Sequence, residues 1–368
     1  MKKSYKIFKL LGIDVELHYS WFLVFLLLAW GLSADFFPHY YPDLTKGVYW
    51  AMGLISSLLL FGSVLAHEFS HSLVARKNKI NVDKITLFFF GGIAHVGGDE
   101  DLTPKKEFKM AIAGPLLSLF LGLVFFAINI SSSFVYLEAI TYYLYKLNFI
   151  LAAFNMAPGY PLDGGRVLRS VAWGITKDIK KATKIASKGG KIIAGAMIFF
   201  GFIGIFLGMG TLWFVILGFF LYYIAGASYE QMILKEVLSN VKIKEVMVKD
   251  VRTVKPDISL SDLFQDHFLK YGTEGTLVAK NKKFLGAITI NELKSIPKPE
   301  WSRKKVKDLM VPASKIDTAK ENDNAMKILN KMAKSKIGVM PVIKNKKLAG
   351  AVSLGSLIRY VKLNQEIS

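Results

Sequence analysis

The chain has 368 residues, a net charge of +20 and 52% hydrophobic residues, with a mean hydropathy of +0.35. These values are too apolar for an ordinary soluble protein and too polar for a chain that lies wholly within a membrane, and the length allows two or three domains. The sequence contains no cysteine, which excludes disulfides and thiolate metal sites. Anionic lipid and membrane topology explain the excess of Lys and Arg, so we expect a lipid bilayer and no nucleic acid as a partner.

Apolar stretches in residues 1–227 predict an α-helical polytopic membrane domain with about six transmembrane helices, since each stretch is near the roughly 20 residues that a bilayer requires. The expected spans are residues 20–35, 50–75, 109–130, 136–157, 191–208 and 211–227. The first residues carry four lysines but no cleavage-site pattern, which favours a retained N-terminus over a removable signal.

Basic residues concentrate on one side of these spans. The rich segments are the N-terminus, residues 76–109 and residues 166–191, whereas Lys46 is the only Lys or Arg in residues 36–48, 131–135 and 209–210. The positive-inside rule then predicts a multi-pass protein of the cell membrane with its N- and C-termini in the cytoplasm.

The second expected span contains His67-Glu68-Phe69-Ser70-His71. Residues i and i+4 share one face of a helix, so both imidazoles can bind one metal ion, and Glu68 can reach a water at that ion. Membrane helices also carry histidines that only hydrogen-bond to neighbours. Among six histidines in all, this spacing with an intervening Glu favours a metal site, and ionisable groups inside lipid are usually functional.

A catalytic zinc needs a third protein ligand, and Asp163 is the candidate. It follows the fourth expected span in a stretch where Pro158 and Pro161 break the helix and glycines allow sharp bends. Broken backbone at membrane depth is tolerated where it lines a cavity. The alternative is that this stretch simply ends a helix at the interface, but a nearby metal motif that lacks one ligand favours the metal role.

Residues 85–98 predict a short membrane-associated β-hairpin with a Gly-Gly turn at Gly91 and Gly92. Our hypothesis is that an open strand edge here pairs with unwound substrate by β-augmentation. An equally good alternative is a re-entrant hairpin that only covers the site.

The C-terminal part is lysine-rich and internally repeated. Ile243 and Val306 begin matching segments 63 residues apart, and Lys280 and Lys344 begin matching Lys-Asn-Lys-Lys turns 64 residues apart. This pattern predicts two α+β repeats that face the cytosol. The expected division is a membrane domain at 1–227, a linker at 228–240, and repeats at 241–298 and 299–368.

The motif at His67–His71 and the stretch from Asn155 to Arg166 resemble the site-2 protease family of intramembrane metalloproteases, and the repeats resemble a pair of CBS (cystathionine-β-synthase-type) domains. The protease resemblance implies one Zn²⁺ per chain, with His67, His71 and Asp163 as ligands. It implies that Glu68 is a general base that later gives its proton to the leaving amine, and that Asn155 contacts the substrate or its oxyanion.

The CBS resemblance implies adenine-nucleotide binding in clefts between the repeats. The family pattern has Thr or Ser three residues before an Asp that holds ribose hydroxyls. Here these positions are Thr289 with Glu292, whose carboxylate could still accept ribose hydroxyls, and Ser353 with Ser356, which departs from the pattern. At most one cleft therefore matches the pattern. A structural role, such as homodimerisation through the CBS domains, competes with nucleotide binding.

Together these features predict an intramembrane zinc endopeptidase that cuts in or near transmembrane segments of other proteins, modulated by the CBS pair. The alternative from another class is a CBS-regulated transporter or channel without proteolytic activity. The absence of inverted repeats and of a charged ring among the spans speaks against it. The intact set of predicted ligands speaks against a third alternative, a scaffold that binds substrates without cutting them.

Overall fold

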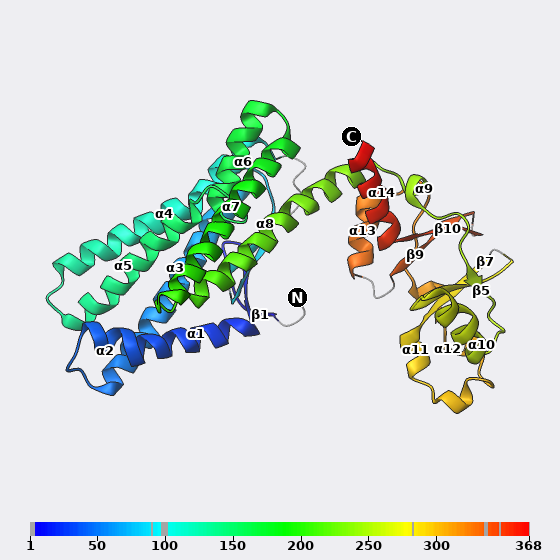
Figure 1. Ribbon diagram of the computed structural model, residues 1–368, viewed down its shortest axis with the longest axis horizontal. Coiled ribbons are helices and arrows are strands. Elements are labelled where there is room, and N and C mark those ends of the chain that lie inside the picture. The colour runs from blue at the N-terminus through cyan, green and yellow to red at the C-terminus, as the bar shows by residue number, and fades with distance from the viewer. Residues whose placement is uncertain are drawn as a thin grey trace. The chain divides into compact units, whose positions relative to one another are not determined.

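The computed structural model describes residues 4–89, 91–96, 102–281, 283–334, 338–345 and 347–367. The chain divides into two compact units, Met1–Tyr229 and Glu230–Ser368 (Figure 1). Each unit is described by itself.

The first unit is mostly helical. Its helices are α1 (Tyr19–Gly31), the π-helix η1 (Leu32–Phe36), α2 (Phe37–Tyr40), α3 (Lys46–Lys77), α4 (Pro104–Ser131), α5 (Val135–Asn155), α6 (Asp163–Thr176), α7 (Ile179–Phe206) and α8 (Leu212–Ser239). Helices α4 and α5 pack along each other, and α4 also packs against α3 and α6 (Figure 1).

Within the described ranges, five helical segments are long and apolar enough to cross a membrane. They are Tyr19–Tyr40, Lys46–Lys77, Pro104–Ser131, Ile179–Phe206 and Leu212–Ser239. The expected fourth span forms α5 but is not among the five, and this helix carries Glu138 and Lys146. The expected span at 191–208 belongs to a longer helix, because α7 begins at Ile179.

A four-stranded sheet lies beside these helices. It consists of β1 (Ser4–Leu10), β2 (Ile13–His18), β3 (Val82–Phe88) and β4 (Gly91–Val96), in that order. The pairs β1–β2 and β3–β4 are antiparallel, and β2–β3 is parallel. Because β1 and β4 are the two edges of the sheet, β4 has one side without a neighbouring strand among the described residues.

The predicted hairpin is present as β3–β4, but its turn was misplaced. Gly91 pairs with Phe88 and Gly92 pairs with Leu87, so both glycines begin β4 and the connection precedes them. The parts of the prediction at residues 90, 97 and 98 lie outside the described residues. Strands β1 and β2 were not predicted. The lysines of β1 suggested only a charged N-terminus, and the alternation of apolar and polar residues in β2 was overlooked.

An apolar core fixes the sheet to the helices. Ile13 and Val15 of β2 and Ile85 and Leu87 of β3 are almost completely buried. They join one cluster with α1 and α3 residues, namely Trp21, Phe61, Phe69 and Ala75. The sheet is therefore held at the Lys77 end of α3, close to the two histidines.

The second unit is α+β, as predicted. One sheet has the order β5 (Thr253–Val254), β6 (Gly275–Lys280), β7 (Lys283–Thr289), β8 (Val311–Pro312), and another pairs β9 (Val339–Lys344) with β10 (Lys347–Ser353). The helical segments are α9 (Ile243–Val246), α10 (Leu260–Asp262), η2 (Leu263–Leu269), α11 (Ile290–Lys294), η3 (Lys298–Glu300), α12 (Val306–Leu309), η4 (Ala313–Lys315), α13 (Ala325–Lys334) and α14 (Leu354–Ile367).

The internal repeat is visible in the backbone of this unit. Each repeat has an antiparallel strand pair followed by a helix, β6–β7–α11 in the first and β9–β10–α14 in the second. Asn281 and Asn345, at matching places in the two Lys-Asn-Lys-Lys turns, have φ of 53° and 50°. Asn tolerates this left-handed conformation better than most residues. Residues 228–239, most of the segment expected as a linker, form the end of α8.

Candidate functional site

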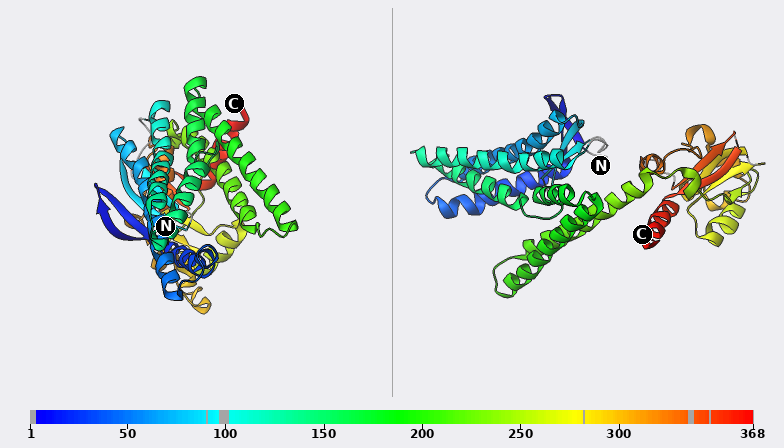
Figure 2. Two further views of the ribbon diagram at one scale, coloured as in Figure 1. Left: turned by 90° about the vertical axis from the view of Figure 1, so that its left-hand side faces the viewer. Right: turned by 90° about the horizontal axis from the view of Figure 1, so that it is seen from above.

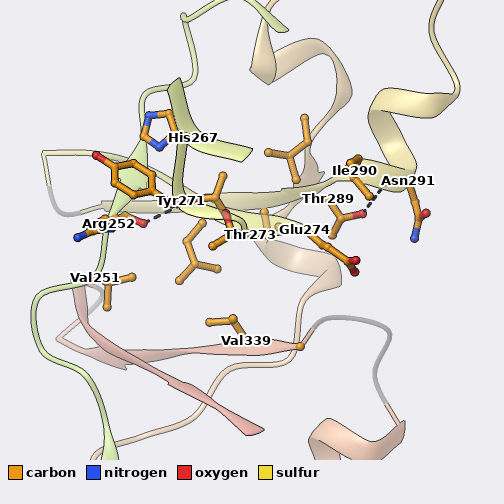
Figure 3. A pocket seen from close by; sticks show the side chains of 16 residues that line it. Val251, Arg252, His267, Tyr271, Thr273, Glu274, Thr289, Ile290, Asn291 and Val339 are labelled. Atoms are coloured by element: carbon orange, nitrogen blue, oxygen red, sulfur yellow. Dashed lines mark hydrogen bonds between the residues drawn. The ribbon is translucent and has the colours of Figure 1, made fainter. Parts of the chain in front are cut away.

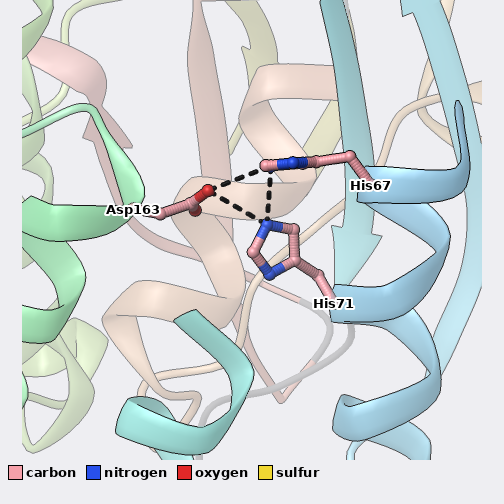
Figure 4. Close-up of side chains that lie close together, drawn as sticks. All are labelled: His67, His71 and Asp163. Carbon is pink, nitrogen blue, oxygen red and sulfur yellow. Dashed lines mark hydrogen bonds and ion pairs between the residues drawn. The ribbon is translucent and has the colours of Figure 1, made fainter. Parts of the chain in front are cut away.

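The structure brings His67, His71 and Asp163 together, although Asp163 is 92 residues beyond His71 in the sequence (Figure 4). The two histidines lie on one face of α3, and Asp163 is the first residue of α6. The Nε2 atoms of His67 and His71 are 3.1 Å apart, and Asp163 Oδ2 is 3.1 Å from each of them. Both imidazoles are buried. These are the three residues that the sequence analysis named as candidate ligands, and the structure brings their side chains together.

Helix α4 orients both imidazoles from behind. The Nδ1 atom of His71 is 2.6 Å from the carbonyl oxygen of Met110, and that of His67 is 2.8 Å from Ser118 Oγ. A carbonyl can only accept, so the His71 Nδ1 carries a proton, and Nε2, the ring atom that faces Asp163 and His67, is the nitrogen that can bind a metal ion. Outer partners of this kind fix the tautomer and orientation of metal-binding histidines.

The donor set fits a zinc ion. Three ligand atoms at zinc bond lengths in a tetrahedral arrangement are about 3.3 Å apart, close to the 3.1 Å separations found here. Gly114 of α4 leaves space for a zinc ion, because a Cβ atom at this position would lie 2.2 Å from His71 Nε2 and 2.5 Å from His67 Nε2. Two neutral imidazoles and one carboxylate leave a fourth position open, as catalytic zinc sites require.

Asp163 is positioned by the loop before it. Tyr160 donates its backbone N–H to the carbonyl oxygen of Ala186 in α7, at 3.0 Å. Helix α7 lies so close to the loop that a Cβ on Gly190 would be 1.9 Å from the Tyr160 carbonyl oxygen. Gly159 packs directly against Gly190 of α7, whereas Gly164 and Gly165 pack against the backbone of the loop itself, and the chain enters α6 at Asp163.

A buried ion pair joins α6 to α4. Arg169 donates from Nε to Oε1 of Glu107 at 2.7 Å, and a second guanidinium nitrogen contacts the same oxygen. Glu107 is completely buried. Its other oxygen, Oε2, has no hydrogen-bond partner within the described part of the chain. Helix α4 therefore contacts both parts of the site. It supplies the hydrogen-bond partners of the two histidines, and through Glu107 it binds α6, the helix that carries Asp163.

The ligands open onto a cavity of about 590 Å³. Glu68 lines it and packs closely against strand β4, because a Cβ on Gly92 would be 2.4 Å from Glu68 Cγ. Arg166 lines it from α6. The apolar part of the wall comes from α5 and α8, through Leu151, Phe154, Leu217, Phe220, Leu221 and Ile224.

Asn155, predicted as a substrate contact, also lines this cavity. It is the last residue of α5, and its Nδ2 donates to the carbonyl oxygen of Leu151 in the same helix at 3.0 Å. One hydrogen of the Asn155 side-chain amide is therefore bonded within α5. The second amide hydrogen and the side-chain oxygen form no hydrogen bond with a described residue.

Sequence reasoning missed the supporting residues Met110, Ser118, Gly92 and Arg166. A backbone carbonyl or a serine in an apolar span has no motif of its own, so only the packing of α4 against α3 reveals these roles. The pair Glu107 and Arg169 could have been noticed as charges beside apolar runs.

The second unit contains a separate cavity of about 480 Å³ (Figure 3). Thr289 lines it together with Arg252, His267, Tyr271 and Asn291. Glu292, the predicted ribose ligand, is not among the lining residues. Its carboxylate accepts the backbone N–H of Thr289 at 2.8 Å in a capping box at the start of α11. Ser353 and Ser356 form the equivalent reciprocal bonds at the start of α14.

Comparisons with known proteins agree with this architecture. The model of peptidase family M50 matches residues 55–142 and 131–197, and the CBS domain model matches residues 243–297 and 306–363. "Zinc metalloprotease MJ0392" of Methanocaldococcus jannaschii is 33% identical over 374 residues, covering 99% of this chain and 97% of the relative. The solved structure "Site-2 Protease from Methanocaldococcus jannaschii" is 32% identical, covers 61% of this chain and 95% of that chain, and superposes with a TM-score of 0.44.

Proposed function

The chain belongs to peptidase family M50 and is an intramembrane zinc metalloendopeptidase of the site-2 protease type, and we propose that His67, His71 and Asp163 hold one zinc ion with Glu68 as its general base. The observation that carries this assignment is the convergence of three ligand atoms at separations of 3.1 Å. The CBS-regulated transporter has no support from these relatives.

The proposed chemistry divides between the ion and the side chains. Bound zinc supplies Lewis acidity, which polarises the scissile carbonyl and makes water a better nucleophile at neutral pH. Glu68 takes the proton from the attacking water and passes it to the leaving amine. Asn155 and Arg166 line the same cavity, and we assign to Asn155 a contact with the substrate carbonyl through its uncommitted amide hydrogen.

The substrates are membrane proteins, and we propose that the cleaved bond lies in or near a transmembrane segment that has been locally unwound. The edge strand β4 supports this proposal, because Gly91, Gly92 and Ile93 line the cavity beside Glu68. A substrate strand added to this edge would bring its backbone to the ligands. Proline scanning of residues 86–96 tests the pairing, and unchanged cleavage across the stretch would leave only a covering role for the hairpin.

The protein is a multi-pass membrane protein, and we propose that both termini are cytoplasmic. The distribution of Lys and Arg around the spans supports this orientation. Reporter fusions at residue 368 and after residue 133 test it, because the two sites must report opposite sides of the membrane.

For the CBS pair we propose adenine-nucleotide binding in the cavity lined by Thr289, with homodimerisation as the competing role. Two residues that line this cavity support the proposal. Arg252 can contact a phosphate and Tyr271 can stack on a base, and they lie side by side, with the Arg252 guanidinium 4.2 Å from the centre of the Tyr271 ring. The Thr289 hydroxyl and Glu292 bond each other in the capping box, and of the two only Thr289 lines the cavity, so we assign the contact with ribose to Thr289. Titration of labelled ATP and AMP onto the full-length protein tests this, and no binding at millimolar nucleotide would remove the sensor role.

The central test compares the wild type with Glu68→Gln. Metal analysis and cleavage of a single-span substrate are measured on the same purified preparations. We expect one zinc per chain in both proteins and loss of cleavage in the variant by about 10²–10⁴-fold, the usual contribution of general acid–base catalysis. Retained cleavage would remove Glu68 from the mechanism, and absence of zinc from the wild type would remove the metal assignment.

A further inference from the structure

The N-terminal hairpin β1–β2 has one apolar and one polar face. Opposite residues of an antiparallel pair lie on the same face, so the register places Tyr5 with Leu17, Phe8 with Val15, and Leu10 with Ile13. The other face carries Lys6 opposite Glu16 and Lys9 opposite Asp14. An ion pair of 2.7 Å between Lys6 and Asp14 and another of 2.9 Å between Lys84 and Glu16 lie on this polar face.

The apolar face extends beyond the protein core. On β2 it is buried at Ile13 and Val15, with 0% and 1% exposure, and half-buried at Leu17, whereas on β1 Tyr5, Phe8 and Leu10 are 64%, 42% and 46% exposed. Leu11 at the turn is 64% exposed. Both views of Figure 2 show this hairpin, in dark blue, projecting from the helices. A contiguous exposed apolar surface of this kind marks an interaction site.

Two connections place the hairpin at the membrane surface. Helix α1, part of the first candidate span, begins at Tyr19, directly after β2 ends at His18. At the other end of the hairpin, the Arg76 guanidinium donates to the carbonyl oxygen of Leu11. Arg76 and Lys77 are the basic last residues of α3, where a span meets the headgroups.

We propose that strand β1 lies in the membrane interface, with Tyr5, Phe8 and Leu10 in lipid and Lys6 and Lys9 toward the water and anionic headgroups. The apolar face of β1 continues the face that β2 and β3 turn toward α1 and α3. The ion pair between Lys6 and Asp14 reduces the cost of bringing the polar face near lipid. Interfacial helices with a basic polar face and an aromatic apolar face bind membranes by burying apolar area and by attraction to anionic lipids, and β1 offers both kinds of side chain.

The absence of cysteine permits a direct test in the full-length protein. Single cysteines are introduced by Phe8→Cys, Leu10→Cys and, as the matched control on the opposite face, Lys9→Cys. Each is labelled with a nitroxide in vesicles of phosphatidylcholine and phosphatidylglycerol. Collisions with oxygen, which enters lipid, are compared with collisions with a water-soluble nickel chelate. Zinc content and cleavage are measured on each variant to verify folding.

We expect labels at 8 and 10 to be reached by oxygen, at a depth of roughly 5–10 Å in the interface, and the label at 9 to be reached by the chelate. Equal access of the chelate to all three positions would overturn the proposal. Dipolar broadening between labels at position 8 of two copies would also overturn it, by identifying a second chain as the occupant. Tyr5→Cys, on the same face, replaces either test variant that fails to fold.

Discussion

Glu107 and Arg169 form a buried ion pair between α4 and α6, and this pair connects the helix that supports both histidines with the helix that begins at Asp163. The third ligand is distant in sequence from the other two, so its placement depends on how α6 packs against α4. The ion pair is a specific contact that fixes this packing.

We therefore predict that Glu107→Gln weakens zinc binding without removing a ligand. Loss of a buried charge partner costs about 3–5 kcal/mol, and loosening of Asp163 should raise the zinc Kd by about 10–100-fold, as for other groups that orient ligands. Competition with a chelator measures the Kd, and excess zinc should restore part of the cleavage. Lys105→Gln, an exposed change nearby, is the control, and an equal Kd in both variants would refute the prediction.

Gly114→Ala should abolish zinc binding. A Cβ at this position would lie 2.2 Å from His71 Nε2, so either the imidazoles or α4 must move away from the ligand geometry. Metal analysis of the purified variant checks this. Gly62→Ala is the matched control, because apart from the backbone of α3 and the adjacent residues no described atom lies within 4 Å of a new Cβ there. A Gly114→Ala protein with a full complement of zinc would contradict the proposed site.

Ser118→Ala should weaken zinc binding less severely than Gly114→Ala. The hydroxyl lies 2.8 Å from His67 Nδ1, and its loss leaves the ring orientation and tautomer less constrained. We expect the zinc Kd to rise by about 10–100-fold, with cleavage restored at saturating zinc. Ser131→Ala removes a hydroxyl whose one bond among the described residues is to Ala127 of its own helix, and this variant should leave the Kd unchanged.

Glu16 should make stability depend on pH. Its pKa is lowered by a hydrogen bond from Ser4 and by Lys84, against an opposing effect of burial. Because the Glu16 pKa is lower in the folded than in the unfolded protein, the ionised carboxylate stabilises the fold at pH values above the unfolded pKa of about 4.5. This stabilisation is lost as the pH falls through the folded-state pKa. We expect Glu16→Gln to lower stability by about 1 kcal/mol at pH 7 and the difference from wild type to vanish in acid. Thermal unfolding in detergent at both pH values measures it, and a constant difference would contradict the assignment.

The convergence of the three predicted ligands could be expected from the sequence, because the chemistry of such a motif is local and specific. His67 and His71 need only a helix to share a face, and the broken helix around Pro158 and Pro161 identified Asp163 once a third ligand was required. The repeated CBS architecture was also predictable, since the matching segments around Ile243 and Val306 preserve both apolar pattern and turn residues.

The remaining features depend on tertiary packing. Met110 contributes a backbone carbonyl, which any residue could supply, and Gly114 matters only because α4 lies against α3. Strand β1 was missed because its apolar residues alternate with lysines and have no buried side. The turn of the β3–β4 hairpin was misplaced because the Gly91-Gly92 pair resembles turn residues, whereas here Gly92 gives Glu68 room beside the strand.

The close approach at Gly114 also restricts how α4 can be rotated about its own axis. Its neighbours Ala113 and Pro115 both carry a Cβ atom, and successive residues of a helix are offset by about 100°. A twist that replaced Gly114 by either neighbour would push a methyl or a pyrrolidine ring between the imidazoles. A turn of this one helix would therefore disrupt the proposed zinc site without a change to any of its three proposed ligand residues.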